Sequence, residues 1–333
     1  MRVTICLKDC GTGAGGFKPG NTCASGRDGG GGGSSVGKID SSLGTRKTSL
    51  AEGVARGQAI MNHLQTAGTV REMVAMAKKG APKGLKVAPR LLGLDKSSLL
   101  FSSISGALAG FIVAREMLGD GAFESAPVKI TSALNKNHVG RFSLRMEGQS
   151  DDSMEIVEDQ IVLHPIIAAT QLSAKSITAA ATAQTLQRGL NATTVLMGMI
   201  VRAREGLEPR PGEERFKGDI KALAKTINPF NADHVTAIYA MEVAIHEATH
   251  RASWVQMRDT QPATSRGKMA AIRKHESTAN VRSFKGITHN STTNGHEFVA
   301  DAIASHALGF HLDKGDCDAY IRAGGPRIPN LCD

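Results

Sequence analysis

Residues 243–254 read Val-Ala-Ile-His-Glu-Ala-Thr-His-Arg-Ala-Ser-Trp. The stretch contains the pattern His-Glu-x-x-His, in which His246 and His250 are four positions apart. On an α-helix the two rings lie about 40° apart around the axis and one turn apart along it, so both can bind one metal ion. Glu247 is rotated by about 100° from His246, where its carboxylate can reach a water molecule on the metal without binding the metal itself. The pattern predicts a metal site with a base beside it.

The surrounding residues favour a helix that presents this pattern to the core. Pro229 is followed by Asn231 and Asp233 as alternative N-caps, and apolar residues then recur every three or four positions. These residues are Ile238, Met241, Ile245, Ala248, Ala252 and Val255. Because the two histidines flank this stripe, we expect the metal at the edge of the core with one side open.

A second helix is predicted downstream, where residues 294–304 read Asn-Gly-His-Glu-Phe-Val-Ala-Asp-Ala-Ile-Ala. Glu297 and Asp301 share one face of it. Glu297 can complete a site of two histidines and one glutamate, with a fourth position left for water, and Asp301 can accept the free ring N–H of a metal-bound histidine. A competing interpretation needs no metal, because Asn294 and Glu297 also have the spacing of a capping box.

Together the two segments resemble the zinc metallopeptidases of the gluzincin type. Glu-Phe-Val-Ala-Asp at 297–301 is similar to the glutamate-bearing helix of lethal-factor-like and related toxin-type metallopeptidases, and the resemblance covers about the last third of the chain. It implies a zincin-like fold, Zn²⁺ held by His246, His250 and Glu297, and Glu247 as general base in the hydrolysis of a protein or peptide substrate.

Metzincin and aspzincin-like zinc sites are the two alternatives to a gluzincin site. A metzincin site is excluded, because Ser253 and Gln256 stand where that family has glycine and a third histidine. An aspzincin-like site, with Asp301 as the third ligand, stays open. Peptide hydrolysis also needs a donor for the oxyanion, for which His289 is our predicted catalytic residue. Two further candidates for this donor are His306 and Tyr320.

The chain divides by composition into three regions. Residues 1–44 include five consecutive glycines at 29–33 and are predicted to be a flexible tail. Its cysteines could hold a small structural metal, although no fourth ligand is evident; they are Cys6, Cys10 and Cys23. Residues 45–120 are predicted to be a basic helical region. Residues 121–333 are predicted to form the zincin-like domain, with a helical insertion at about 166–230.

The formal net charge is +9, and much of it lies in residues 45–96, which hold ten Lys and Arg against three acidic residues. This segment is a candidate for binding an acidic partner or nucleic acid. The alternative is a solvated helical face, which we favour because residues 45–96 contain no aromatic residue for base stacking.

The predicted fold class is α+β, mainly helical, with a small antiparallel sheet before the active-site helix. Apolar spacing predicts two helices over 49–79 broken near Gly68, a linker over 82–89, and a helix over 97–117. Segments of β-rich composition over 127–165, separated by Asn, Gly, Ser and Asp, predict the sheet, with Ile161–His164 as the edge strand available to an extended substrate.

No secretory signal is evident, and the most apolar run, Ala107–Ala114, is too short to cross a bilayer. We therefore expect a soluble protein that is cytoplasmic or virion-associated and does not bind membranes. Residues 16–24 resemble segments of phage-derived structural proteins. This leaves two alternatives to a peptidase of the cell: a phage or mobile-element structural protein with a structural zinc site, and a secreted toxin-type effector protease. The absence of cysteine near His246 argues against a structural zinc.

Overall fold

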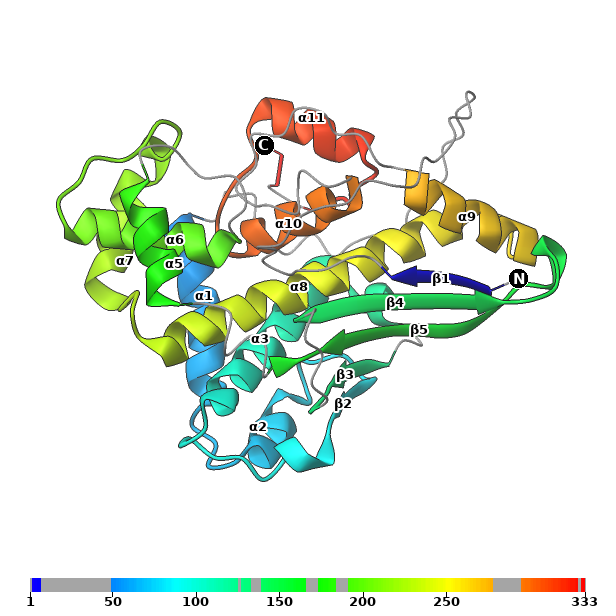
Figure 1. Ribbon diagram of the computed structural model, residues 1–333, viewed down its shortest axis with the longest axis horizontal. Helices are drawn as coiled ribbons and strands as arrows, with labels where there is room; N and C mark the ends of the chain where they lie inside the picture. The colour runs from blue at the N-terminus through cyan, green and yellow to red at the C-terminus, as the bar shows by residue number, and fades with distance from the viewer. Residues whose placement is uncertain are drawn as a thin grey trace.

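Helix α8, Ala232–Asp259, is the long central element of the computed structural model, with α10 and α11 above it and α3 and the β-sheet below it in the view of Figure 1. The structure describes residues 2–6, 49–124, 127–132, 139–165, 173–183, 191–277, 295–328 and 331–332, with only the backbone for 2–6, 151 and 272–277. Asn231 caps α8 by accepting a hydrogen bond from the His234 N–H, as one of the two predicted caps. No glycine or proline interrupts the helix, so its backbone hydrogen bonds continue over 28 residues.

Helix α3, Leu99–Leu118, packs along α8 at close range because small residues line the contact. A Cβ atom at Gly106 would lie 1.9 Å from the Ala237 carbonyl oxygen, and one at Gly110 would lie 2.5 Å from that of Met241. Any side chain at these positions would push the two helices apart. The pair therefore fixes the position of the His-Glu-x-x-His helix from below the site.

The predicted helices before α3 are confirmed. Helices α1, Leu50–Leu64, and α2, Val70–Ala77, are separated near Gly68, and each starts with a capping box. The other helices are α5 (Ala174–Thr182), α6 (Ala192–Arg204), α7 (Lys217–Thr226), α9 (Ser265–Ser277), α10 (Gly295–Ala307) and α11 (Lys314–Arg322), with 3₁₀ turns η1 (Pro89–Leu91), η2 (Asp120–Phe123), η3 (Asp151–Ser153) and η4 (Glu214–Phe216).

The sheet is mixed, so the prediction of an antiparallel sheet is wrong in part. Its strands are β1 (Arg2–Cys6), β2 (Leu85–Val87), β3 (Val128–Ile130), β4 (Gly140–Glu147) and β5 (Glu155–Leu163), in the spatial order β1-β4-β5-β3-β2. Strand β4 runs antiparallel to β1 and β5, whereas β5, β3 and β2 are parallel. The predicted edge strand Ile161–His164 is also wrong, since β5 lies between β4 and β3.

Two short strands formed where the sequence predicted irregular chain. Leu85–Val87 lie within the predicted linker but pair in parallel with Val128–Ile130, because a short parallel strand has too few residues to show an alternating pattern. In the predicted tail, Arg2–Cys6 pair with Ser143–Glu147 of β4. The glycine run, Cys10 and Cys23 lie outside the described residues.

The buried side chains form one continuous core that includes residues of α1, α2, α3, α8 and α10. The predicted boundary at residue 120 therefore does not separate two cores. By length and composition α3 could cross a membrane, but 72% of its most apolar window is buried inside the protein. The burial of α3 against α8 is that of a core helix.

Candidate metal centre

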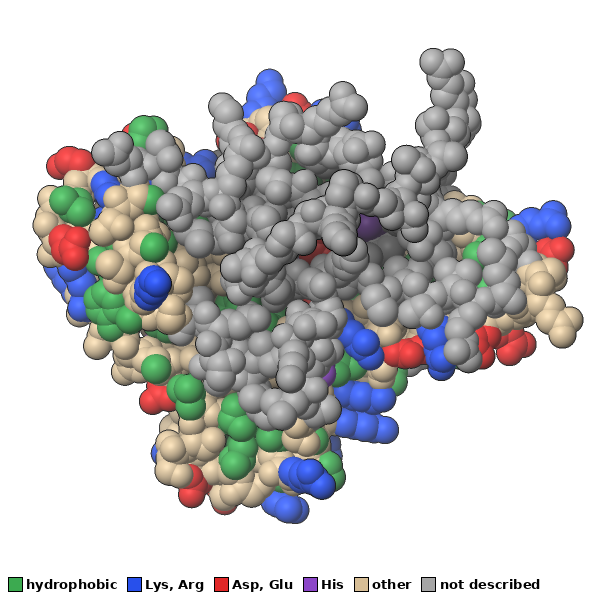
Figure 2. Space-filling model, in the orientation of Figure 1, with side chains coloured by type: hydrophobic (Ala, Val, Ile, Leu, Met, Phe, Trp, Pro, Cys, Tyr) green, Lys and Arg blue, Asp and Glu red, His purple; other side chains and the backbone are tan. Residues whose placement is uncertain are grey.

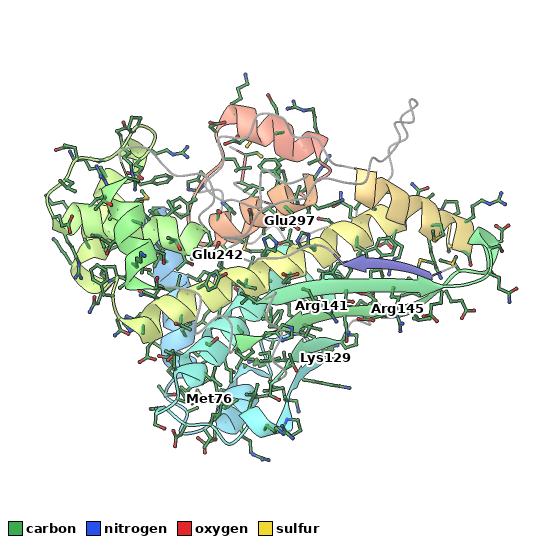
Figure 3. All side chains as sticks on the ribbon, viewed as in Figure 1. Met76, Lys129, Arg141, Arg145, Glu242 and Glu297 are labelled. Atoms are coloured by element: carbon green, nitrogen blue, oxygen red, sulfur yellow. The ribbon has the colours of Figure 1, made fainter. Side chains whose placement is uncertain are left out.

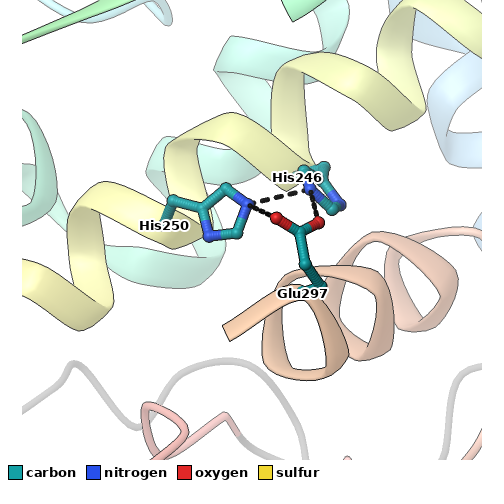
Figure 4. A group of neighbouring side chains, drawn as sticks. All are labelled: His246, His250 and Glu297. Atoms are coloured by element: carbon teal, nitrogen blue, oxygen red, sulfur yellow. Dashed lines mark hydrogen bonds and ion pairs between the residues drawn. The ribbon is translucent and has the colours of Figure 1, made fainter. Parts of the chain in front are cut away.

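Three side chains that can bind a metal ion converge where α10 crosses α8 (Figure 4). His246 and His250 come from consecutive turns of α8, and their Nε2 atoms lie 2.9 Å apart. Glu297, near the start of α10, places Oε2 3.2 Å from His246 Nε2 and Oε1 3.5 Å from His250 Nε2. One ligand atom from each residue lies within 4.8 Å of the others. The structure thus brings together the three residues predicted as ligands.

Asp301 lies one turn after Glu297 on α10 and contacts the other side of the His246 ring. Its Oδ1 is 2.8 Å from His246 Nδ1. This contact places the Nδ1 proton of a neutral His246 ring toward Asp301 and leaves the Nε2 lone pair directed at His250 and Glu297. Asp301 therefore occupies the predicted position of a residue that orients a metal-binding histidine.

Glu247 is buried on α8 but does not belong to the three-residue group. It lies against β4: a Cβ atom at Gly140 would be 2.8 Å from Glu247 Cγ, and the nearby Phe142 backbone acts to lower the pKa of the Glu247 carboxylate. Burial raises the pKa of Glu247, and the neighbouring charges of His246 and His250 oppose that shift. A glycine at position 140 leaves the space that this carboxylate fills.

The carboxylate of Glu297 behaves differently from that of Glu247. Burial acts to raise the pKa of Glu297, but His250 and His246 outweigh it and hold that pKa well below its usual range. The adjacent His296 is also buried, and burial, together with the charge of His250, lowers the pKa of His296 to about 3. Glu297 is therefore an anion facing two imidazoles, as a ligand requires.

The group is enclosed, unlike the open-sided site expected from the sequence. His246, His250 and Glu297 are 3%, 2% and 2% exposed. Side chains of α8 are buried all around the helix from Val235 to Trp254, so the apolar stripe does not mark a single inner face. The expectation failed because α3, β4 and α10 each cover a different side of α8.

The other predicted residues that the structure describes do not join the group. His289 and Asn294 lie outside the described residues, so neither the predicted oxyanion donor nor the capping box can be placed. His306 is nine residues beyond Glu297, about 13 Å along α10, and its ring lies against that of His311. The Tyr320 hydroxyl donates to the Pro326 carbonyl oxygen at 2.5 Å, which makes it a structural group.

Glu242, one turn before His246, is a buried carboxylate that the sequence analysis missed. It accepts hydrogen bonds from the Ala192 N–H at 2.8 Å, the Thr193 N–H at 2.9 Å and the Thr193 hydroxyl at 2.6 Å. Burial raises the pKa of Glu242, and the bonds from Thr193 oppose this. Glu242 thereby fixes the start of α6 to α8. An acidic residue inside an otherwise apolar stretch of a helix was the available indication.

Arg251, directly after His250, holds the same helix to the sheet. Its guanidinium makes two hydrogen bonds of 2.9 Å to Asp159 of β5 and also donates to the carbonyl oxygens of Ala122 and Glu124. Arg251 is 1% exposed. The two ends of the His-Glu-x-x-His segment are thus fixed by buried charges, Glu242 toward α6 and Arg251 toward β5.

Comparison of the chain with protein-family models, curated proteins and solved structures found no match. The arrangement of these side chains is therefore the basis for assigning a function.

Proposed function

We propose that the protein is a zinc-dependent metallopeptidase that hydrolyses peptide bonds. The observation that carries the proposal is the convergence of His246, His250 and Glu297 on one point, with their ligand atoms within 4.8 Å of one another. Two of these residues come from one helix and the third from a helix that is distant in sequence. Such convergence of an anion and two imidazoles inside a protein is typical of a metal site.

The contacts between the two histidines also favour a cation. Because Asp301 accepts from His246 Nδ1, a neutral His246 ring presents a lone pair from Nε2 toward His250 Nε2, 2.9 Å away. A positive ion between these atoms and Glu297 relieves the crowding of electron-rich atoms. Two imidazoles and one carboxylate suit zinc, which as a bound ion supplies Lewis acidity and lowers the pKa of water to about 7.

Glu247 supplies the base in this proposal. Its carboxylate is on the same helix as both histidines, lies outside the ligand group and is buried against β4. In hydrolysis it accepts a proton from the attacking water and returns it to the leaving amine, so no proton is gained or lost over the cycle. The fixed position against Gly140 keeps the carboxylate beside the metal ligands.

A peptide substrate is favoured by the neighbouring strand. On the side of β4 away from β5, β1 pairs only with Ser143–Glu147, and no strand among the described residues pairs with Gly140–Phe142. Gly140 and Phe142 adjoin Glu247. The main-chain groups of these two residues that face away from β5 can pair with an extended peptide and direct one of its carbonyls toward the site.

A structural zinc site is the competing interpretation. Structural zinc is held by four protein ligands, commonly including cysteine. Within the described part of the chain, the group contains only His246, His250 and Glu297. Three protein ligands and an adjacent unliganded carboxylate suit a catalytic site better.

The decisive experiment combines metal analysis with a broad peptide-digestion assay. Glu247→Gln should retain the metal and lose hydrolysis by at least about 100-fold, because it removes the base and spares the ligands. Glu242→Gln is the matched control, being the same change on the same helix at a carboxylate that contacts α6. It should retain both metal and hydrolysis. Metal-loaded wild-type protein that cleaves no peptide in the library would refute the proposal.

A further inference from the structure

Three basic side chains form a row across the sheet, on the face opposite α8. Lys86 of β2 is in register with Lys129 of β3, Lys129 with Val162 of β5, and Val162 with Arg141 of β4. Neighbouring strands are about 4.8 Å apart, so the row extends about 14 Å. Figure 3 shows Lys129 and Arg141 over the same part of the sheet, and Figure 2 shows Lys and Arg side chains gathered there.

The alternation of side chains fixes which face carries the row. Asp159 of β5 contacts Arg251 of α8, so Asp159 and its partner Leu144 lie on the α8 side. Residues an odd number of positions from Leu144 and Asp159 lie on the other side, which places Arg141 and Val162 away from α8. Because Glu247 contacts Gly140, the sheet separates the basic row from the metal centre.

Among the described residues no ion pair neutralises the row, although the charge of Arg141 acts on the Glu158 carboxylate. Lys86 and Lys129 are exposed, and none of the three residues forms an ion pair with a described residue. The nearby Arg145 differs, since it lies 3.1 Å from Glu147 and 3.5 Å from Glu158. The Nε of Arg141 is buried without a hydrogen-bond partner among the described residues. Placing Lys86 directly beside Lys129 costs stability, because like charges opposite each other in a sheet repel. A bound anion would offset this cost.

We propose that the row Lys86, Lys129 and Arg141 binds the phosphate backbone of double-stranded nucleic acid. A duplex carries one charge per about 1.7 Å of its axis, so 14 Å of duplex carries about eight phosphate charges on its two strands, and those on the near side face the row. Exposed Lys83 adjoins the row, because it lines with Lys86 a cavity of about 660 Å³, which Asp120 and Glu124 also line. Binding would be insensitive to sequence, since regularly placed cations contact phosphates and do not read bases.

The burial of the aromatic residues favours double-stranded nucleic acid over single strands and acidic proteins as the ligand of the row. The single Trp and both Tyr of the chain, Trp254, Tyr239 and Tyr320, are at most 3% exposed. Binding of single strands uses exposed aromatic rings for base stacking, and protein interfaces commonly use Trp and Tyr as anchors. Among the described phenylalanines only Phe230, directly before α8, is exposed, so no described aromatic ring is available at the row, whereas binding to a duplex backbone requires only positive charge.

The test measures binding of a 20-base-pair duplex of arbitrary sequence to the full chain by fluorescence anisotropy at several salt concentrations. The triple variant Lys86→Gln/Lys129→Gln/Arg141→Gln should bind at least tenfold more weakly at low salt. Its slope of log K against log salt should be smaller by about 2.7, which is 0.9 for each of three lost phosphate contacts. The variant Lys86→Arg/Lys129→Arg keeps the charges and should retain the wild-type slope.

The matched control is Lys175→Gln/Lys221→Gln/Lys314→Gln, which removes the same charge from exposed lysines on three helices elsewhere. It should leave the slope within about 1 of wild type. Equal losses in the two triple variants would mean that only net charge matters and would overturn the proposal. Equally strong binding of poly-L-glutamate or of single-stranded DNA would overturn it too. Thermal melting of each variant separates lost binding from lost folding, and His246→Ala should not affect duplex binding.

Discussion

Asp301 Oδ1 lies 2.8 Å from His246 Nδ1, on the side of the ring opposite the nitrogen that faces His250 and Glu297. If Asp301 orients the ring and does not bind the metal itself, Asp301→Asn should weaken zinc binding by about 10- to 100-fold without abolishing it. A competition assay with a zinc chelator measures the change. Complete loss of zinc in Asp301→Asn, with zinc retained in Glu297→Gln, would favour the aspzincin-like alternative.

Glu297→Gln tests the third ligand. A neutral amide binds zinc poorly and removes the anion that faces both histidines, so we expect most of the metal and all hydrolysis to be lost. A residue that served only as a helix cap would behave differently. Glutamine can replace glutamate in a capping box, so metal would be retained and the free energy of unfolding would fall by at most about 1 kcal/mol.

Glu242→Ala tests the carboxylate that holds α6. The change leaves the Ala192 and Thr193 N–H groups buried without their acceptor. We expect the free energy of unfolding to fall by about 2–5 kcal/mol, as measured by chemical denaturation. Glu208→Ala is the control, because the Glu208 side chain is 82% exposed and pairs only with exposed Lys217. It should change stability by no more than about 0.5 kcal/mol.

Glu158 should contribute to the pH dependence of stability. The hydrogen bond from Ser143 is the main cause that lowers the pKa of Glu158 below its ordinary value of 4.5. A lowered folded-state pKa stabilises the protein above the unfolded-state pKa, and this contribution is lost as pH falls through the folded-state pKa. The stability difference between wild type and Glu158→Gln should therefore be constant above about pH 5.5 and shrink toward pH 3. A difference that grows on acidification would contradict this assignment.

Deleting residues 1–6 should lower the melting temperature, because it removes the pairing of Arg2–Cys6 with β4. Zinc content should stay at the wild-type level, since Ser143–Glu147 contribute no ligand. Deleting the glycine run 29–33 is the control, and it should leave the melting temperature unchanged because glycine has no side chain to contribute to a core. An unchanged melting temperature after the first deletion would mean that β1 adds nothing to the sheet.

The parts of the site that lie close in sequence were predictable. Helical geometry alone placed His246 beside His250, and the same geometry put Glu297 and Asp301 on one face. Their meeting across two helices depended on the resemblance, because no local pattern relates α8 to α10. Burial of the site was not predictable, since a hydrophobic stripe reports one covered face and α8 is covered on several.

Sequence patterns did not predict the order of the strands in the sheet or its shortest strand. Strands β4 and β5 are long enough to be predicted, but their neighbours are set by pairing between distant segments. The three-residue strand Leu85–Val87 is too short to show a periodicity, and a proline on either side of it suggested a linker. Glu242 was missed for a similar reason, because its partners on α6 are 49 and 50 residues away.

The pairing of β1 with β4 also bears on how the chain folds. Arg2–Cys6 cannot join the sheet until Ser143–Glu147 have been synthesised. The β1 segment therefore stays unpaired while the ribosome makes α1, α2 and α3. Closing a loop of this length is slow compared with forming the local helix pairs, which places β1 among the last elements to dock. Until then β4 has an unpaired edge, and that edge is where a newly made chain is most exposed to aggregation.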